Sequence, residues 1–98
     1  MESIEELFGS RGRTRVLRVL SENGELNISA IGRSTGMNHE DVNDHLKKLK
    51  EAGLISEKRF GTTRIFQVAF NRIAVRFEKG LGIRLEWDGL EDCPQDLP

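Results

Sequence analysis

Apolar residues recur every three or four positions through the first half of the chain, as they do on one face of a helix. One such group predicts a helix over about residues 11–22: Val16, Leu17, Val19 and Leu20. Asn23 and Gly24 form a typical C-terminal stop for that helix. In front of it, Ser3 and Glu6 have the spacing of a capping box and predict a short first helix.

Two further helices are predicted, with a short turn between them. The first begins near Ser29 and ends at Gly36, because glycine readily adopts the left-handed conformation of a helix end. Asn38 caps the second, which ends at Gly53. Its apolar face consists of Val42, Leu46, Leu49 and Ala52. Two helices joined by a three- to four-residue turn containing glycine predict a helix-turn-helix over residues 28–52.

Beyond Gly53 the pattern changes from helical to strand-like. Residues 54–60 and 64–69 are predicted strands, and Gly61-Thr62-Thr63 has the length of a hairpin connection. A hairpin directly after a helix-turn-helix is a wing, here over residues 54–69. The expected fold is therefore α+β, a winged helix-turn-helix with a three-helix core, a two-stranded wing and flanking N- and C-terminal dimerisation elements.

The C-terminal element, residues 71–87, fits two patterns. A helical spacing predicts a helix from about Asn71 to Lys79 and is formed by Ile73, Phe77, Leu81 and Leu85. A strand-like alternation is formed by Ile83, Leu85 and Trp87. Gly80 and Gly82 would each cost a helix about 1 kcal/mol, so the structure after residue 79 stays open. We expect one domain over residues 1–87 and a loose acidic tail over residues 88–98.

Composition and charge narrow the class of protein. With 37% apolar and 32% charged residues, the 98-residue chain is typical of a small soluble domain. The chain has no apolar run of about 20 residues, so we expect no membrane helix. Its N-terminus is acidic, so we expect no secretory signal and a cytoplasmic protein. Cys93, the only cysteine, excludes an internal disulfide and leaves an intermolecular one open. Although the net charge is −1, basic residues cluster at residues 10–20 and 58–76. The local positive potential of such clusters attracts the phosphate backbone of a nucleic acid.

From Leu7 to Val68 the order of elements resembles that of winged-helix transcriptional regulators of the ArsR and MarR type. Three strings carry the resemblance: RTRVLRVL from residue 13, GELNISAI from residue 24 and, most specifically, VNDHLKKLKEAGLI from residue 42. The chain is most similar to small archaeal members of this group. The resemblance implies a homodimer that binds double-stranded DNA, with the second helix of the helix-turn-helix in the major groove and the wing on phosphate or the minor groove.

Metal-sensing ArsR proteins carry a Cys-x-Cys pair at the positions that Asn27 and Ser29 occupy here. Neither side chain is a soft-metal ligand, so that sensor site is absent and we expect no metal and no cofactor. His39 and His45 are six residues apart and lie on different faces of a helix, so they do not jointly bind one ion. We expect His45 to be a packed or capping residue.

The exposed positions of the predicted recognition helix are the candidates for base contacts. They are Asn38, His39, Glu40, Asn43, Asp44 and Lys47. Acidic residues here allow two interpretations. Glu40 and Asp41 can stabilise the helix N-terminus, by about 0.3–1 kcal/mol each. Alternatively, Glu40 or Asp44 accepts a hydrogen bond from a cytosine amino group while Asn43 contacts an adenine.

Basic and hydroxyl residues around the helix-turn-helix are the candidates for phosphate contacts. They are Arg11, Arg13, Arg15, Lys48, Lys58, Arg59, Thr62, Thr63 and Arg64. Arg18 joins Arg11, Arg13 and Arg15 in the first half of one helix. Positive charges near a helix N-terminus interact unfavourably with the helix dipole, which favours phosphate contact over helix stabilisation as their role. The competing interpretation pairs them with Glu2, Glu5 and Glu6. For Lys47, Lys48 and Lys50 the alternative is a solvated face with pairing such as Asp44 to Lys48.

Apolar residues outside the predicted core are the candidates for dimer contacts. They are Ile4, Leu7, Phe8, Ile73, Phe77, Leu81 and Trp87. The function that fits best is a dimeric DNA-binding transcriptional regulator, located on the nucleoid. The alternative is a winged helix that binds another protein through its acidic recognition face. An enzyme is not expected, because no reacting group with a base beside it stands out.

Overall fold

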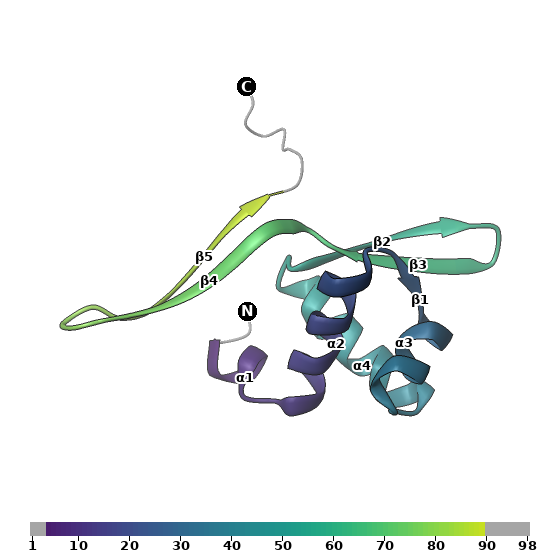
Figure 1. The fold of residues 1–98 in the computed structure, drawn as a ribbon, viewed down its shortest axis with the longest axis horizontal. Helices are drawn as coiled ribbons and strands as arrows, with labels where there is room; N and C mark the ends of the chain where they lie inside the picture. The colour runs from purple at the N-terminus through teal and green to yellow at the C-terminus, as the bar shows by residue number, and fades with distance from the viewer. Residues whose placement is uncertain (1–3, 90–98) are drawn as a thin grey trace, which may run out of the picture. The chain divides into compact units, whose positions relative to one another are not determined.

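The chain divides into two compact units, Met1–Val68 and Ala69–Pro98, where the sequence had suggested one domain over residues 1–87. The computed structural model describes residues 4–89 (Figure 1). The expected capping residue Ser3 and Cys93 lie outside the described residues, as do residues 90–98 of the expected tail. The first two residues of that tail, Asp88 and Gly89, belong to a strand instead. We call the two parts the N-terminal unit and the hairpin unit and describe each by itself.

The first two helices of the N-terminal unit are α1, Ile4–Phe8, and α2, Arg11–Asn23. Helix α2 begins where Ser10 accepts a hydrogen bond from the backbone N–H of Arg13, at 3.2 Å. It ends at Gly24, whose φ of 81° stops the helix while its N–H still donates to the carbonyl of Leu20. The predicted helix over residues 11–22 is confirmed.

The helix-turn-helix is formed by α3, Ile28–Thr35, and α4, His39–Glu51. Gly36 ends α3 in the left-handed conformation, with a φ of 76°. Asn38 begins α4, because its side chain accepts from the backbone N–H of Asp41 at 2.8 Å. Both predicted helices and the turn between them are confirmed.

A three-stranded sheet completes the N-terminal unit, with strand order β1-β3-β2. The wing strands are β2, Ile55–Phe60, and β3, Thr63–Val68, paired antiparallel from Ile55 with Val68 to Phe60 with Thr63. Gly61, with a φ of 62°, is the first of the two residues that connect them. Strand β1, Leu26–Asn27, pairs with β3 and was not predicted, because two residues are too few to show alternation.

The hydrophobic core of the N-terminal unit lies where the helices meet the sheet. Its largest fully buried side chains come from α2, α3, α4, β3 and the segment before β2: Val16, Leu20, Ile31, Val42, Leu46, Leu49, Leu54 and Phe66. Five of these positions had been marked by the helical spacing: Val16, Leu20, Val42, Leu46 and Leu49. None of the helices within residues 4–89 has the length and apolar character needed to span a membrane.

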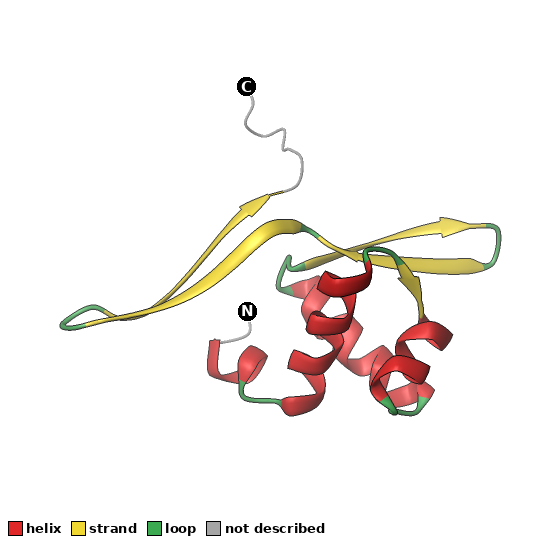
Figure 2. Cartoon of the chain, in the orientation of Figure 1, coloured by secondary structure: helices red, strands yellow, loops and turns green. Residues whose placement is uncertain are grey.

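The hairpin unit corrects the prediction for residues 71–79, which form no helix. Its strands are β4, Phe70–Glu78, and β5, Gly82–Gly89, which form an antiparallel pair (Figure 2). Gly80 and Gly82 have φ values of 83° and 86°, outside the right-handed helical region, and allow the chain to reverse. The alternation seen in residues 83–87 extends back through Ile73, Val75 and Phe77, and β-branched residues favour strands.

Candidate nucleic-acid interface

Helix α4 presents a polar face because its apolar face is fixed in the core. Val42, Leu46 and Leu49 are buried, which sets the rotation of the helix about its axis. The face opposite them carries three predicted base-contact residues, Glu40, Asp44 and Lys47, all exposed. Two other candidates lie at the start of the helix and are also exposed: His39 and the capping residue Asn38. The tertiary structure therefore leaves most of the predicted recognition positions accessible.

The flank of α4 that faces the wing is held by a network of charged and polar side chains. Nε and Nη2 of Arg64 donate to the two carboxylate oxygens of Glu57, at 2.6 and 3.2 Å. Nη1 of the same Arg64 donates to Oδ1 of Asn43, at 3.2 Å. Nζ of Lys50 donates to Glu57 as well, at 3.0 Å. Arg64 and Lys50 thus both connect the wing strands to the recognition helix.

The pleat of the wing explains why these side chains meet. Side chains two apart on a strand share a face, so Arg64 of β3 lies on the same face as the buried Phe66, and its guanidinium lies 5.1 Å from the centre of that ring. Glu57 of β2 is the cross-strand partner of Phe66 and shares this face. The network therefore continues the core-facing side of the wing beyond the apolar residues.

Glu57 is the most enclosed charged group of the network. Its side chain is only 6% exposed, and the hydrogen bond from Arg64 is the main reason that its pKa falls from 4.5 to about 2. The Lys50 ammonium lowers the pKa further, while burial opposes the shift. The same pairing raises the pKa of Arg64. Glu57 is therefore ionised throughout the physiological range.

Some of the wing residues predicted to contact phosphate form close ion pairs within the chain, and others keep largely exposed side chains. Arg64 is held in the network, and Lys58 pairs with Glu25 across 2.6 Å. Arg59 keeps a side chain 66% exposed, 3.7 Å from the Glu57 carboxylate. At the tip, Thr62 and Thr63 are exposed. Thr62 and Thr63 also line a shallow hollow together with residues from the starts of α3 and α4: Asn27, Ile28, Ser29 and His39.

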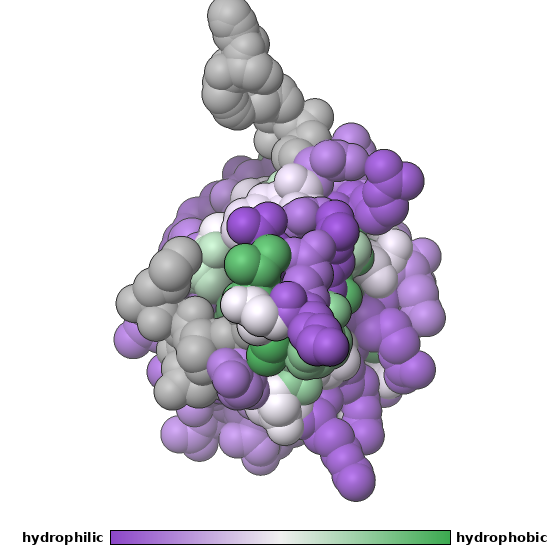
Figure 3. All heavy atoms as spheres, turned by 90° about the vertical axis from the view of Figure 1, so that its left-hand side faces the viewer, coloured by the Kyte–Doolittle hydropathy of each residue, from purple (hydrophilic) through white to green (hydrophobic). Residues whose placement is uncertain are grey.

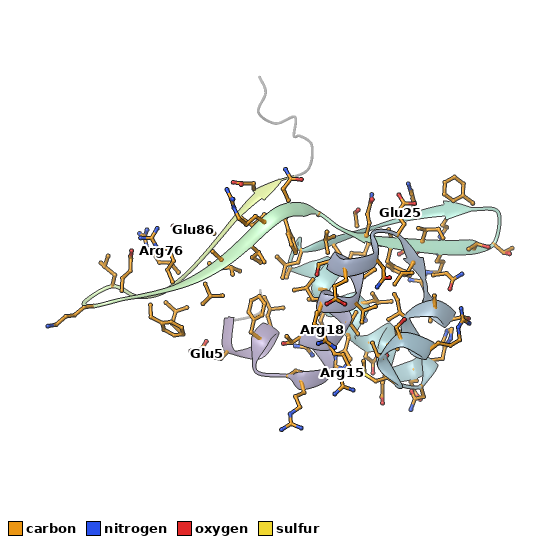
Figure 4. All side chains as sticks on the ribbon, in the orientation of Figure 1. Glu5, Arg15, Arg18, Glu25, Arg76 and Glu86 are labelled. Carbon is orange, nitrogen blue, oxygen red and sulfur yellow. The ribbon has the colours of Figure 1, made fainter. Side chains whose placement is uncertain are left out.

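The arginines of α2 do not share one environment. Nη1 of Arg15 donates to the backbone carbonyl of Thr35, at 3.1 Å, and so satisfies an acceptor at the C-terminal end of α3. Arg13 is half-buried, whereas Arg11 and Arg18 are exposed. Figure 4 shows Arg15 and Arg18 along α2, and Glu5 on the neighbouring α1. Arg15 has a structural partner, which the sequence pattern did not reveal.

His45 is a packing residue, as predicted. It lies on the flank of α4 that faces α2, where a Cβ added at Gly12 would come within 2.6 Å of its Nε2 atom. Burial, together with the charge of Arg13, lowers the pKa of His45, and the carboxylates of Asp41 and Asp44 oppose that shift. The imidazole is therefore neutral at pH 7 and fills the space that glycine leaves.

Asn27, which lies where metal-sensing ArsR proteins carry a cysteine, is a helix-capping residue in this chain. The Oδ1 atom of Asn27 accepts from the backbone N–H of Ala30 at 2.8 Å and caps α3. Within residues 4–89, no three His, Cys, Asp or Glu side chains are grouped so that they could hold a metal ion.

The dimer candidates divide between the two units. Leu7 is 4% exposed, so its side chain is already covered within the chain, and Phe8 is half-buried. The Ile4 side chain lies outside the described residues. In the hairpin unit Phe77, Leu81 and Trp87 are exposed. The hairpin unit thus offers the more accessible of these candidates, together with the half-buried Ile73.

Glu57 is the residue that sequence reasoning missed, and its pairing with Lys50 was not foreseen. A signal was present, because Glu57 lies two residues after the apolar Ile55 on a strand and therefore shares its inward face. A carboxylate at an inward position needs a cationic partner. Which cation supplies it depends on the strand register, which the sequence pattern does not contain.

Comparison with known proteins agrees with this geometry. Residues 10–57 match the family described as bacterial regulatory protein, arsR family. An HTH-type transcriptional regulator of Mycobacterium tuberculosis is 34% identical over 65 residues, which are 66% of this chain and 28% of that protein. An uncharacterized HTH-type transcriptional regulator of Methanocaldococcus jannaschii is 27% identical over 66 residues, covering 67% of this chain and 74% of that one.

A solved structure gives the same result for the fold. The solution structure of a homodimeric winged helix-turn-helix DNA-binding domain from Mycobacterium bovis, a possible ArsR-family transcriptional regulator, superposes with a TM-score of 0.55 at 34% identity. The match covers 61% of this chain and 56% of that one. The predicted winged helix-turn-helix fold is confirmed. Residues 10–57 of the chain form an ArsR-family helix-turn-helix domain.

Proposed function

We propose that the chain is a transcriptional regulator that binds double-stranded DNA as a homodimer. The observation that carries the proposal is the helix-turn-helix of α3 and α4, whose apolar faces are buried while the outer face of α4 stays accessible. The match of residues 10–57 to the ArsR family supports the same role. The M. bovis relative is described as a homodimeric DNA-binding domain, which supports the dimer and favours DNA over a protein partner for the acidic face.

The recognition helix enters the major groove in this proposal, with the exposed face of α4 toward the bases. The candidates for base contacts remain Asn38, His39, Glu40, Asn43, Asp44 and Lys47. Glu40 lies in the first turn of α4, where it stabilises the helix N-terminus. Asp44 lies one turn further on, so we assign to Asp44 the hydrogen bond from a cytosine amino group.

Asn43 contacts a base through its side-chain amide in this proposal. Its Oδ1 atom already accepts from Arg64, which identifies the oxygen end of the amide. A bidentate contact to adenine uses the second lone pair of that oxygen to accept from adenine N6, while an N–H of the same amide donates to N7. The adenine contact expected from the sequence is therefore kept in this proposal beside the hydrogen bond from Arg64.

Phosphate contacts come mainly from exposed groups in this proposal. They are Arg11, Lys48, Arg59, Thr62 and Thr63. Lys48 and Arg59 also interact within the chain but stay exposed, whereas Arg13, Arg15, Lys58 and Arg64 contribute chiefly by positioning the elements. The role is one of binding rather than catalysis, and chromosomal DNA in the cytoplasm is where it would act.

Fluorescence anisotropy with duplexes selected from a random pool tests the proposal. We expect affinity to fall steeply with salt, because each phosphate contact releases counterions. Arg59→Ala should weaken binding to all duplexes and reduce the salt slope by about 1. Lys79→Ala, which removes an equal charge from the exposed turn of the hairpin unit, is the matched control and should change neither. Failure to retain any duplex at low salt would refute DNA binding.

Asn43→Asp tests the base contact separately. The substitution keeps the acceptor for Arg64 and removes both N–H donors, so the wing stays anchored while base preference is lost. We expect selection to lose sequence preference at one base position in each half-site, at a cost of about 1–3 kcal/mol on the preferred duplex. An unchanged preference would show that Asn43 makes no base contact.

A further inference from the structure

The hairpin unit has one face made of apolar side chains. Three cross-strand pairs form it: Ile73 with Trp87, Val75 with Leu85 and Phe77 with Ile83. Because side chains alternate along a strand and directly opposite residues share a face, all six point the same way. This apolar face contains no charged residue over its three pairs.

The opposite face of the hairpin is charged and internally paired. Arg72 lies opposite Asp88 at 3.4 Å, and Arg76 reaches both Glu78, at 2.7 Å, and Glu86, at 3.4 Å. Figure 4 shows Arg76 and Glu86 side by side on one side of the ribbon. These ion pairs are compatible with water, so the charged face needs no covering partner.

The apolar face, in contrast, is only partly covered: Ile73, Ile83 and Leu85 are half-buried, and the other three side chains are exposed. Phe77 is 78% exposed, Trp87 40% and Val75 39%. In Figure 3, which looks from the side where the hairpin turn lies in Figure 1, apolar groups appear at the surface among polar ones. A two-stranded hairpin is at best marginally stable by itself, and a lasting exposed apolar patch marks an interaction site.

We propose that the apolar face of the hairpin packs against the same face of a second copy of this chain. The inference rests on the proposed homodimer and assigns its contact surface. A two-fold interface needs a self-complementary patch, and a face without charge meets its own copy without like-charge repulsion. A strongly charged partner, such as nucleic acid, would find no complement on it.

The pairing pattern suits such a two-fold arrangement. Val75 and Leu85 form the central pair, with one larger aromatic-containing pair on each side. A two-fold axis beside the central pair places the Ile73–Trp87 end of one face over the Phe77–Ile83 end of the other. Two sheets then stack face to face, about 10 Å apart, with both charged faces in solvent.

Sedimentation equilibrium of the full chain tests the proposal. Val75→Lys puts a charge at the centre of the apolar face, and Ala74→Lys puts the same charge on the neighbouring position of the charged face, opposite Glu86. We expect Val75→Lys to raise the dimer dissociation constant roughly tenfold or more, since an unpaired buried charge is strongly unfavourable. Ala74→Lys should sediment like the parent chain. Circular dichroism verifies that each variant folds.

Trp87 supplies an independent signal, because it is the only tryptophan. Its emission should shift to the red as the parent chain is diluted through dissociation, and should be red-shifted at all concentrations in Val75→Lys. A monomer whose emission is blue at every concentration would overturn the proposal in favour of packing within the chain. A monomer with red-shifted emission would overturn it in favour of another partner.

Cysteine crosslinking decides the matter where Val75→Lys does not fold. In a Cys93→Ser background, Val75→Cys should form an intermolecular disulfide on oxidation and Ala74→Cys should not. If the parent chain is dimeric but Val75→Lys and Val75→Cys leave the dimer unaffected and uncrosslinked, the hairpin assignment is wrong and the homodimer stands. If the parent chain is a monomer, the proposed homodimer is wrong as well, while the anisotropy titration judges DNA binding separately.

Discussion

The two units of the chain place similar apolar side chains in opposite situations. In the N-terminal unit, helices and a sheet form layers, and the apolar side chains between them are covered on both sides, as Leu46 and Phe66 are. The hairpin unit has one layer of two strands, so its apolar face has no interior to occupy. Among the side chains that the structure describes within residues 4–89, four of the five large apolar ones that are exposed belong to the hairpin unit: Val75, Phe77, Leu81 and Trp87. Layering, rather than apolar content, therefore separates a self-sufficient unit from one that needs a partner.

Charged residues show the same difference. Glu57 in the N-terminal unit is 6% exposed and held by Arg64 and Lys50, and its network sets the position of the wing. Arg72 and Asp88 in the hairpin unit are 82% and 63% exposed. Water screens such a pair, which is worth at most about 1 kcal/mol. Similar ion pairs are thus structural in one unit and nearly neutral in the other.

The largest expected contrast comes from truncating one leucine in each unit. Leu46→Ala should lower the free energy of unfolding by about 2–5 kcal/mol, because it leaves a cavity in the core. Leu85→Ala in the dilute chain should cost about 1 kcal/mol, since Leu85 is only half-buried. Urea denaturation followed by circular dichroism for the helices and by Trp87 emission for the hairpin measures both. Equal losses would contradict the distinction between the units.

An intermediate effect is expected from the Glu57 network. Arg64→Gln removes the bidentate partner of an enclosed carboxylate and should destabilise the N-terminal unit by about 1–3 kcal/mol. Arg59→Gln is the matched control, because Arg59 is 66% exposed and 3.7 Å from the same carboxylate, and it should change stability by less than about 0.5 kcal/mol. Thermal unfolding followed by circular dichroism compares the two. If both variants melt alike, Arg64 does not anchor the wing.

A smaller and graded effect is expected on acidification. The pKa of Glu57 falls from 4.5 to about 2 in the folded chain, so the unfolded chain takes up the proton first as pH drops. The stabilisation from this group is complete above pH 4.5 and is lost as pH falls toward 2. Glu57→Gln lacks this contribution, so its stability should decline less than that of the parent chain between pH 5 and pH 3. Parallel declines, measured by urea denaturation at each pH, would show that Glu57 is not strongly paired.

The N-terminal unit was predictable because its signals are local. Capping by Asn38, the left-handed Gly36 and the spacing of Val42, Leu46 and Leu49 each act within a few residues, and the structure confirms them. The hairpin unit was mispredicted between Asn71 and Lys79 because Ile73, Phe77 and Leu81 also satisfy a helical period. Two glycines with positive φ, and a cross-strand register that is continuous from Arg72 to Glu78, decided between the two patterns.

For the candidate site, the sequence determined which residues lie on the recognition helix and which on the wing. Only the tertiary structure decided which of these residues form hydrogen bonds or ion pairs within the chain. Arg64 and Asn43 are 21 residues apart, and Arg15 and Thr35 are 20 apart, so the hydrogen bonds between them depend on how α4, the wing, α2 and α3 pack. Periodicity and capping are properties of neighbouring residues and are visible in the sequence, whereas a partner brought close by folding is not. That physical difference explains why the helix-turn-helix was found from the sequence, while the anchoring role of Arg64 and the apolar face of the hairpin were not.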